Sequence, residues 1–199
     1  MFLGTTGLYV AIAHRLELMG RPEESLPKIV VFDLDYTLWP CWCDTHISPP
    51  VTRSKDENAI VDRYGSKMAF YKDVPEIIAH LKQNGVKVAA ASRTCAPVLT
   101  VPDVAKKMLS LLYIDGTRAI DHFDVLEIYP GSKITHFNFI QKQTGFEYHD
   151  MLFFDDETRN KEVEHRLGVK FMFVIEGVTW KLYHQAIEAW RDHKGHRSQ

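Results

Sequence analysis

The sequence has few cysteines and no long run of basic residues, and these two absences already narrow the class of protein. Its 199 residues include three cysteines, and the formal net charge is -2. With 45% hydrophobic residues, a chain of this length can bury a core without disulfide bonds, so we expect free thiols and a reducing compartment. The chain lacks the basic stripe typical of nucleic-acid-binding proteins, so we expect no nucleic-acid partner.

Long apolar segments are also missing. No stretch approaches the roughly 20 apolar residues that a membrane-spanning helix needs, so we expect no membrane partner. Residues 1–26 lack the pattern of a secretory signal, and their apolar residues from Leu8 to Met19 recur at helical spacing. We therefore predict a helical or disordered N-terminal extension on a protein of the cytoplasm, or of cytoplasm and nucleus. An organelle-targeting leader is the alternative.

From Pro27 onward, short apolar runs alternate with segments of helical period. This alternation predicts an α/β fold with a doubly wound parallel sheet, covered by helices on both faces. We expect one domain over residues 27–192 and a polar tail over residues 193–199. The expected strands are 29–34, 86–91, 124–128, 151–154 and 170–175. The alternation within residues 59–71 predicts a small β-hairpin around Tyr64-Gly65-Ser66.

The helices between these strands have recognisable ends. Three polar residues are placed to cap helix N-termini, and three glycines are placed to end helices. The predicted caps are Asp73, Asp103 and Thr179, and the predicted ends are Gly85, Gly145 and Gly168. Asp73 is followed by Glu76 at the spacing of a capping box, which strengthens the prediction for that helix.

Polar residues cluster directly after four of the expected strands. The clusters are Asp33 with Asp35, Ser92-Arg93-Thr94, Gly131-Ser132-Lys133, and Asp155-Asp156. In an open parallel sheet, ligands bind beyond the carboxyl ends of the strands. One such cluster is as typical of a turn or a helix cap as of a site, but four at one edge of a sheet predict an active site.

The aspartates in these clusters point to a metal ion. Three carboxylates brought together repel one another unless a cation neutralises them. The ligands are oxygen atoms and no histidine set converges with them, so the expected ion is Mg²⁺. Phosphoryl transfer follows from this, because its catalysis is mostly positioning and charge stabilisation, to which Lys133 and the Ser92 hydroxyl contribute.

The same motifs resemble those of the haloacid dehalogenase-like phosphatases. The segments that carry the resemblance are Asp33-Leu34-Asp35-Tyr36-Thr37-Leu38, Ala91-Ser92-Arg93, Lys133 and Asp155-Asp156-Glu157-Thr158-Arg159-Asn160. Three longer segments are similar to the eukaryotic magnesium-dependent phosphatase family, whose members are acid phosphatase-like with a minimal cap. These segments are Phe32 to Pro40 with Trp42 to His46, Ile128 to Lys133, and Phe153 to Glu157. The resemblance covers about Lys28 to Trp190 and implies a Rossmann-like haloacid dehalogenase core without a cap domain.

The resemblance also implies catalytic and metal-binding roles. Asp33 would be the nucleophile that forms a phosphoryl-aspartate, and Asp35 would act as general acid and then as general base. Mg²⁺ would be held by the Asp33 carboxylate, the Asp35 main-chain carbonyl and Asp156.

Further residues are expected to bind the substrate or support the site. The substrate-binding set implied by the resemblance is Leu34, Ser92, Arg93 and Lys133. Around them, Thr37 would fix the turn, Asp155 would orient Lys133, and Asn160 would orient a metal-bound water.

Cysteine and aromatic residues near the first motif allow two interpretations. Cys41-Trp42-Cys43 with His46 could suggest zinc, but a fourth ligand at suitable spacing is missing, so loop packing is the better interpretation. The same applies to Trp39, Trp42, Phe70 and Tyr71, some of which could border the substrate. No sequence feature gives Cys95 a role.

The predicted function is that of a phosphomonoester phosphatase. A phosphotransferase of the same superfamily and a non-catalytic phosphate-binding interaction module are the alternatives. A receiver domain does not fit, because it carries its phosphorylated aspartate in the middle of the chain. The segments 41–72 and 94–129 leave room for a loop, a hairpin, one helix and one strand, which predicts an open site. The family resemblance then points to phosphotyrosine or to fructosamine-type sugar phosphates, either as small molecules or on protein side chains.

Overall fold

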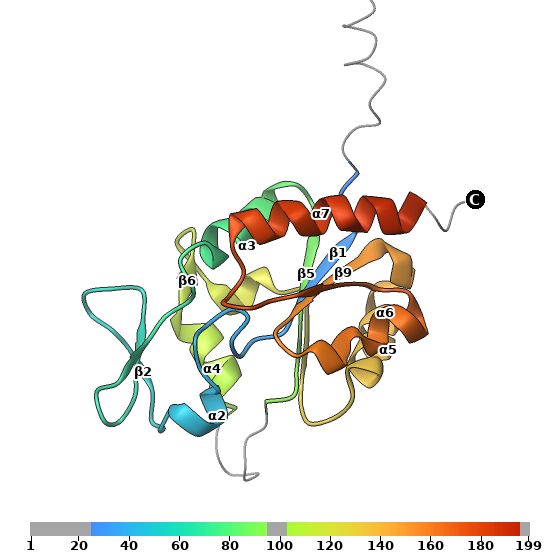
Figure 1. Ribbon diagram of the computed structural model, residues 1–199. Coiled ribbons are helices and arrows are strands. Elements are labelled where there is room, and N and C mark those ends of the chain that lie inside the picture. The colour runs from blue at the N-terminus through green and yellow to red at the C-terminus, as the bar shows by residue number, and fades with distance from the viewer. Residues whose placement is uncertain (1–24, 95–102, 196–199) are drawn as a thin grey trace, which may run out of the picture.

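A computed structural model describes residues 25–94 and 103–195 of the chain. Its central sheet has five strands in the order β10-β9-β1-β5-β8 (Figure 1). The strands are β1 (Ile29–Phe32), β5 (Lys87–Ser92), β8 (Val125–Ile128), β9 (Met151–Asp155) and β10 (Lys170–Phe173). All four neighbouring pairs run parallel. The predicted α/β fold with a doubly wound parallel sheet is therefore confirmed.

Helices cover both faces of this sheet (Figure 1). The helices that share a core cluster with one face are α3 (Val74–Gln83), α4 (Val104–Leu111) and α7 (Trp180–Gly195). Those on the other face are α5 (Lys133–Thr144) and α6 (Glu162–Leu167). Successive side chains of a strand point to opposite faces, so Val30 joins the first cluster and Val31 the second. This two-sided burial explains why the strands read as unbroken apolar runs.

The strand order creates a crevice beside β1. The chain passes from β1 to β5 and β8 on one side, then crosses to β9 and β10 on the other. Connections therefore diverge next to the carboxyl end of β1, which is where ligands bind in open α/β sheets.

Most of the predicted helix ends are confirmed. The Asp103 side chain accepts a hydrogen bond from the Lys106 amide, and the Thr179 hydroxyl accepts one from the Leu182 amide. Gly145 ends α5 with a φ of 69° in the left-handed region, as a helix-ending glycine should.

Helix α3 starts directly after Asp73, as predicted, but the predicted side-chain cap is wrong. The Asp73 side chain does not cap α3. Instead it accepts a hydrogen bond from the Trp180 amide at 3.1 Å, and Glu76 accepts one from Trp180 Nε1 at 3.2 Å. The two acidic residues that resembled a capping box thus join the start of α3 to the start of α7.

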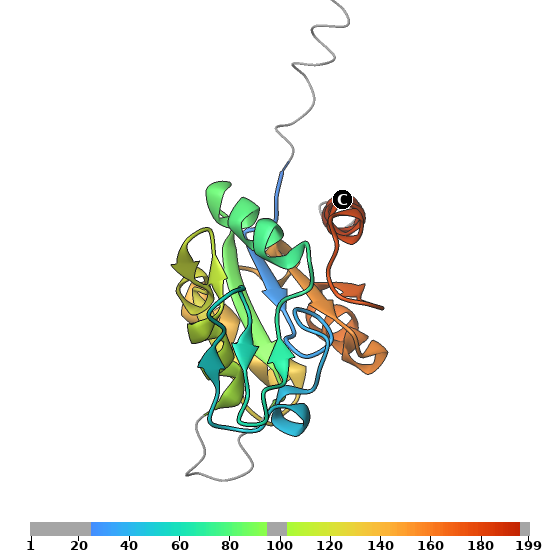
Figure 2. The same cartoon turned by 90° about the vertical axis from the view of Figure 1, so that its left-hand side faces the viewer.

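Two small antiparallel sheets accompany the core. The predicted hairpin is confirmed as β3 (Ile60–Val61) and β4 (Lys67–Met68), and a third strand, β2 (Thr52–Arg53), pairs with β3. Figure 2, in which this sheet faces the viewer, shows it near the short helix α2 (Cys43–His46).

The second small sheet was not predicted. It consists of β6 (Tyr113–Ile114) and β7 (Thr117–Arg118), within a segment expected to hold one helix and one strand. Asp115 and Gly116 between them have positive φ angles of 47° and 75°. Asp-Gly is a strong hairpin signal, so the sequence did contain the information.

A few segments complete the description. Short 3₁₀ helices span Ala119–His122, Tyr148–Asp150 and Thr158–Lys161. Helix α7 runs through Gly195, so the start of the predicted polar tail is helical. The predicted N-terminal helix, Cys95 and the rest of the tail lie outside the described residues. Among the helices that the structure describes, none is both long and apolar enough to cross a bilayer.

Candidate active site

The four polar clusters line one cavity of about 290 Å³ at the carboxyl edge of the sheet. Its lining residues are Asp33, Asp35, Trp42, Asp44, Thr45, Ser92, Arg93, Thr94, Lys133, Asp156, Glu157 and Arg159. The structure thus brings six of the predicted site residues to one cavity. The other four, Leu34, Thr37, Asp155 and Asn160, are buried beside them.

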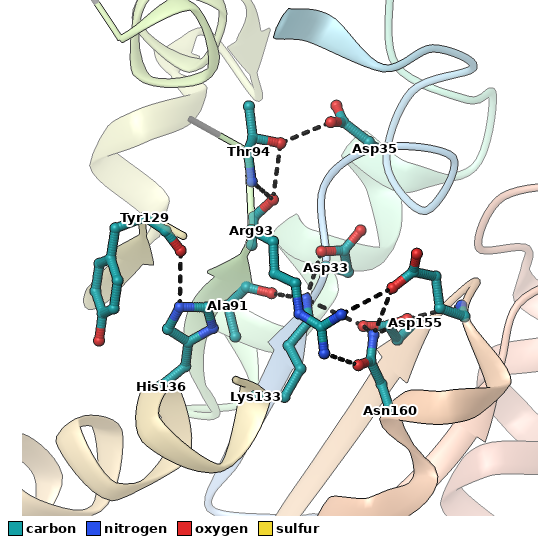
Figure 3. Close-up of polar contacts among 12 residues, drawn as sticks. Asp33, Asp35, Ala91, Arg93, Thr94, Tyr129, Lys133, His136, Asp155 and Asn160 are labelled. Atoms are coloured by element: carbon teal, nitrogen blue, oxygen red, sulfur yellow. Dashed lines mark hydrogen bonds and ion pairs between the residues drawn. The ribbon is translucent and has the colours of Figure 1, made fainter. Parts of the chain in front are cut away.

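Lys133 is a buried cation that contacts Asp33 and Asp155 at this site (Figure 3). It opens α5, and its side chain is 1% exposed. The Nζ atom donates a hydrogen bond to Asp33 Oδ1 at 2.6 Å and lies 3.1 Å from Asp155 Oδ2, and it also donates to the Ala91 carbonyl. Burial lowers the pKa of Lys133, but the two carboxylates outweigh burial and the pKa ends above its usual value. Lys133 is therefore a fixed positive charge.

The carboxylates around Lys133 carry more negative charge than it neutralises. Burial, helped by Asp155 and Asp35, raises the pKa of Asp33 to about 8 despite the opposing effect of Lys133. Burial and the Asp155 carboxylate likewise raise the pKa of Asp156 to about 6. A further cation between these groups would restore their ordinary acidity, so the donor set fits a hard divalent ion.

The predicted metal ligands are the Asp33 and Asp156 carboxylates and the main-chain carbonyl of Asp35. Among the described residues, no three His, Cys, Asp or Glu side chains are arranged to hold a metal. With two side chains and one main-chain carbonyl, the set expected from the resemblance stays a prediction. Asp33, Asp35 and Asp156 do line one cavity, as expected, although Trp39, Cys43 and Thr94 donate hydrogen bonds to the Asp35 side chain.

A tight turn after β1 separates the surroundings of Asp33 and Asp35. The Tyr36 amide donates to the Trp39 carbonyl at 2.8 Å, and Tyr36 has a φ of 54°. The Asp35 carboxylate accepts hydrogen bonds from Trp39 Nε1 at 2.7 Å and the Cys43 amide at 3.1 Å, both on Oδ1. Thr94 Oγ1 donates to Oδ2 at 2.6 Å. The sequence analysis gave Trp39 a packing role and placed Thr94 in the second polar cluster without a role of its own.

Arg93 is tied to the fourth motif rather than free in the cavity. Its guanidinium donates to Asn160 Oδ1 and, at 3.4 Å, to Glu157 Oε2. Asn160 Nδ2 in turn donates to both Asp155 oxygens at 2.8 Å, which links Arg93 to the partner of Lys133. Asn160 therefore orients Asp155 and Arg93 in this structure.

Besides Thr94, four cavity-lining residues had no predicted role: Asp44, Thr45, Glu157 and Arg159. Glu157 accepts two hydrogen bonds from Arg159, at 2.9 and 2.6 Å, and both line the cavity. They lie inside the fourth motif, but charged residues in a short helical turn are more often solvated than part of a site, so position alone gave no signal.

Thr37 and Leu34 support the turn through their main chains. The Thr37 amide donates to the Leu34 carbonyl at 3.2 Å, and the Thr37 carbonyl accepts from the Val178 amide at 3.1 Å. The Leu34 side chain is fully buried, so only its main chain could contact a substrate.

The cysteines and aromatics near the first motif are mostly packing residues. Cys41 and Cys43 are buried free thiols, and burial raises the pKa of the Cys41 thiol to about 12. Trp39 is fully buried and stacks on Phe70 with ring centroids 6.0 Å apart. Trp42 is the exception, because it is 54% exposed and lines the cavity.

The fold and the cavity together define a haloacid dehalogenase-like hydrolase. The family model described as Acid Phosphatase matches residues 25–193. A HAD-like hydrolase superfamily protein of Schizosaccharomyces pombe is 48% identical over 155 residues, which cover 75% of this chain and 87% of that protein. Human magnesium-dependent phosphatase 1 is 42% identical over 163 residues, covering 82% and 86%. The chain belongs to the acid phosphatase family of the haloacid dehalogenase-like superfamily, and the predicted family is confirmed.

More distant similarity extends to solved structures. A HAD family enzyme from Bacteroides thetaiotaomicron, solved as a magnesium complex, superposes with a TM-score of 0.54 at 11% identity. The match covers 81% of this chain and all of that one. The N-terminal phosphatase-containing part of a Bacteroides fragilis protein, solved with Mg, gives a TM-score of 0.51 at 16% identity over 86% of this chain and 42% of that one. At these identities the likeness supports the fold alone.

Proposed function

We propose that this protein is a magnesium-dependent phosphomonoester hydrolase that works through a phosphoryl-aspartate on Asp33. The observation that carries the proposal is the placement of Asp33 and Asp35 at one cavity, with Lys133 held 2.6 Å from Asp33. A nucleophile, a proton carrier and a fixed cation are thus within reach of one bound phosphoryl group. Human magnesium-dependent phosphatase 1 and a putative magnesium-dependent phosphatase of Saccharomyces cerevisiae, 38% identical over 172 residues, support the same class of enzyme.

The reaction has two steps, and each uses Asp33 and Asp35. In the first, an Asp33 carboxylate oxygen bonds to phosphorus, the ester bond breaks, and Asp35 gives its proton to the leaving oxygen. In the second, a water gives a proton to Asp35 and bonds to phosphorus, which releases phosphate and frees Asp33. Lys133 and the Ser92 hydroxyl stabilise the charge on the phosphoryl oxygens in both steps.

A magnesium ion would be held by Asp33, Asp156 and the main-chain carbonyl of Asp35. When bound, it supplies positive charge that screens the phosphoryl oxygens from the Asp33 carboxylate. Asp155 and Asn160 hold Lys133 and Arg93 in place beside it.

The role of magnesium can be tested by removing it. Dialysis against EDTA should abolish hydrolysis of an aryl phosphate, and Mg²⁺ should restore it, because two buried carboxylates otherwise repel the substrate. Isothermal titration calorimetry on the Asp156→Asn protein should show weakened Mg²⁺ binding. Full activity after exhaustive chelation would contradict the proposed metal site.

For the substrate, we favour phosphotyrosine or fructosamine-type sugar phosphates, free or on protein side chains. The cavity measures about 290 Å³, and exposed Trp42 on its rim offers a flat face for an aromatic or sugar ring. The small hairpin sheets take the place of a separate cap domain in the described part of the chain. Values of kcat/KM for phosphotyrosine peptides, fructosamine phosphates and common metabolite phosphates test this choice of substrate class. Strong preference for one free metabolite, with neither favoured class hydrolysed, would contradict it.

The same measurements separate the alternative functions. A phosphotransferase would transfer phosphate to an added alcohol or sugar faster than to water, and a phosphate-binding module would show no turnover. Steady release of inorganic phosphate with Mg²⁺ alone excludes both.

We place the protein in the cytoplasm, with or without a nuclear pool. Buried Cys41 and Cys43 with free thiols support a reducing compartment. Fractionation of cells that express the full chain, with detection by antibody, tests this.

A further inference from the structure

The Asp35 carboxylate has two oxygens with chemically different partners, of which Figure 3 shows Thr94. Oδ1 accepts from Trp39 Nε1 and from the Cys43 amide, whereas Oδ2 accepts from the Thr94 hydroxyl. An indole N–H and a main-chain N–H can only donate a hydrogen bond. A proton on Oδ1 would therefore take a lone pair that these donors use and displace at least one of the two hydrogen bonds.

A hydroxyl group behaves differently, because it can donate or accept. Thr94 Oγ1 donates to Oδ2 when Asp35 is ionised, and can rotate to accept from Oδ2 when Asp35 is protonated. Its hydrogen then has an acceptor in Ser92 Oγ, which lies 3.1 Å from Thr94 Oγ1. The Thr94 amide also donates to Ser92 Oγ at 3.3 Å, so Ser92 is held as an acceptor toward Thr94.

Building on the proposed function, we propose that Thr94 is a positioning residue that assigns the catalytic proton of Asp35 to Oδ2 and couples it to Ser92. The three side chains lie at the same cavity, and Ser92 and Thr94 are buried. Trp39 and Cys43 hold the far oxygen, so the carboxylate presents one oxygen to the leaving group.

The coupling gives each step a defined hydrogen-bond pattern. With Oδ2 protonated, Thr94 accepts from Asp35 and donates to Ser92, which leaves the Ser92 hydrogen free to donate to a phosphoryl oxygen. As the ester bond breaks, the Oδ2–H group turns from Thr94 to the leaving oxygen, the proton passes to that oxygen, and Thr94 rotates to donate to the carboxylate. When a water attacks the phosphoryl-aspartate, its proton returns to Oδ2 and Thr94 rotates back.

The test varies how much the leaving group needs a proton. Phenyl phosphate has a poor leaving group that requires protonation, whereas 2,4-dinitrophenyl phosphate has a leaving group that departs as a stable anion. In the full-length Mg²⁺-loaded enzyme, Thr94→Val should lower kcat/KM for phenyl phosphate about 100-fold, the scale of general acid catalysis. It should lower kcat/KM for the dinitrophenyl ester far less, because that ester loses only the Thr94–Ser92 contact and needs no proton, and Thr94→Ser should restore most of the lost activity on phenyl phosphate.

Two further variants serve as controls. Thr117→Val makes the same replacement on exposed β7, and should leave both substrates unaffected. Thr94→Ala should reproduce the selective loss if Thr94→Val fails to fold, with folding followed by thermal unfolding.

The outcomes separate this proposal from the proposed function. If the unmodified protein hydrolyses neither ester, the proposed function fails, and with it the proton role of Thr94. If the protein is active but Thr94→Val and Thr94→Ala lose both esters equally, or lose neither, only the role of Thr94 is overturned. A Thr94→Ser protein as impaired as Thr94→Val would also overturn it, because packing of the methyl group would then explain the loss.

Discussion

Asp33 and Asp35 are two residues apart, yet the turn at Tyr36 gives them unlike surroundings. Asp33 lies against Lys133, while Asp35 is held by Trp39, Cys43 and Thr94. This difference predicts different defects. Asp33→Asn should abolish turnover and the phosphoryl-enzyme together, because an amide is not a nucleophile for phosphorus. Asp35→Asn should lower turnover by a factor of about 10² to 10⁴, since an amide cannot exchange a proton with the leaving group or water.

Trapping after brief exposure to labelled substrate distinguishes the two variants. Label should be found on Asp33 in the unmodified protein and in Asp35→Asn, and be absent from Asp33→Asn. Recovery of the label on any other residue would contradict the assignment of the nucleophile.

His136 is a buried imidazole beside the site whose charge state affects stability. Burial, aided by nearby Lys133 and Arg93, lowers its pKa to about 4, although its hydrogen bond to the Tyr129 carbonyl opposes this. The unfolded chain binds the proton more tightly, with a pKa of about 6.5. Stability is therefore lost as the pH falls from about 6.5 toward 4, by at most about 3 kcal/mol from this residue.

The variant His136→Gln removes this contribution while keeping a donor for Tyr129. Its free energy of unfolding, from urea titrations at pH 7 and pH 5, should depend less on pH than that of the unmodified protein. Replacing exposed His184 by Gln is the matched control. An unchanged pH dependence in His136→Gln would show that folding does not lower the pKa of this imidazole.

Among the elements, the loop between β10 and α7 is held against the first motif. Val178 donates to the Thr37 carbonyl, and the preceding Gly177 has a φ of 70°. A Cβ added at Gly177 would overlap the ring of Tyr71, whereas one added at Gly145, with a φ of 69°, would meet no atom within 4 Å. The two glycines share a backbone conformation and differ in the space around them.

The paired variants Gly177→Ala and Gly145→Ala separate these two effects. Gly145→Ala should cost about 1 kcal/mol, from backbone strain alone. Gly177→Ala should cost about 3 kcal/mol, because displacement of Tyr71 adds to that strain. Thermal and urea unfolding measure both values, and equal losses would mean that Tyr71 moves aside freely.

Across the whole molecule, every predicted site residue lies between β1 and the start of α6. The first core strand begins at Ile29, and the cavity-lining residues span Asp33 to Arg159. We therefore predict that a chain shortened to start at Leu26 keeps its turnover on an aryl phosphate. A shortened chain that folds but turns over far more slowly would show that residues 1–25 contribute to the site. The domain boundary is tested by the same experiment.

The sequence by itself determined the five strands of the central sheet, most helix ends and the four polar clusters, because these depend on local signals. An apolar run buried on both faces, a glycine at the end of a helix and a carboxylate after a strand are each visible in neighbouring residues. Once the strands were known to be parallel, their carboxyl ends had to share an edge, so the lining of the cavity could be predicted.

Only the tertiary structure decided which partners these side chains have. The hydrogen-bonded partners are far apart in the sequence: Asp35 and Thr94 by 59 positions, Lys133 and Asp33 by 100, and Asp73 and Trp180 by 107. The spacing of Asp73 and Glu76 is compatible with a capping box and equally with hydrogen bonds to a distant helix. The position of Asp35 after a strand is compatible with a metal ligand and equally with a hydrogen-bonded acid. Packing of the sheet and its helices brings the distant donor close, and the carboxylate then pairs with the donor that lies nearest to it.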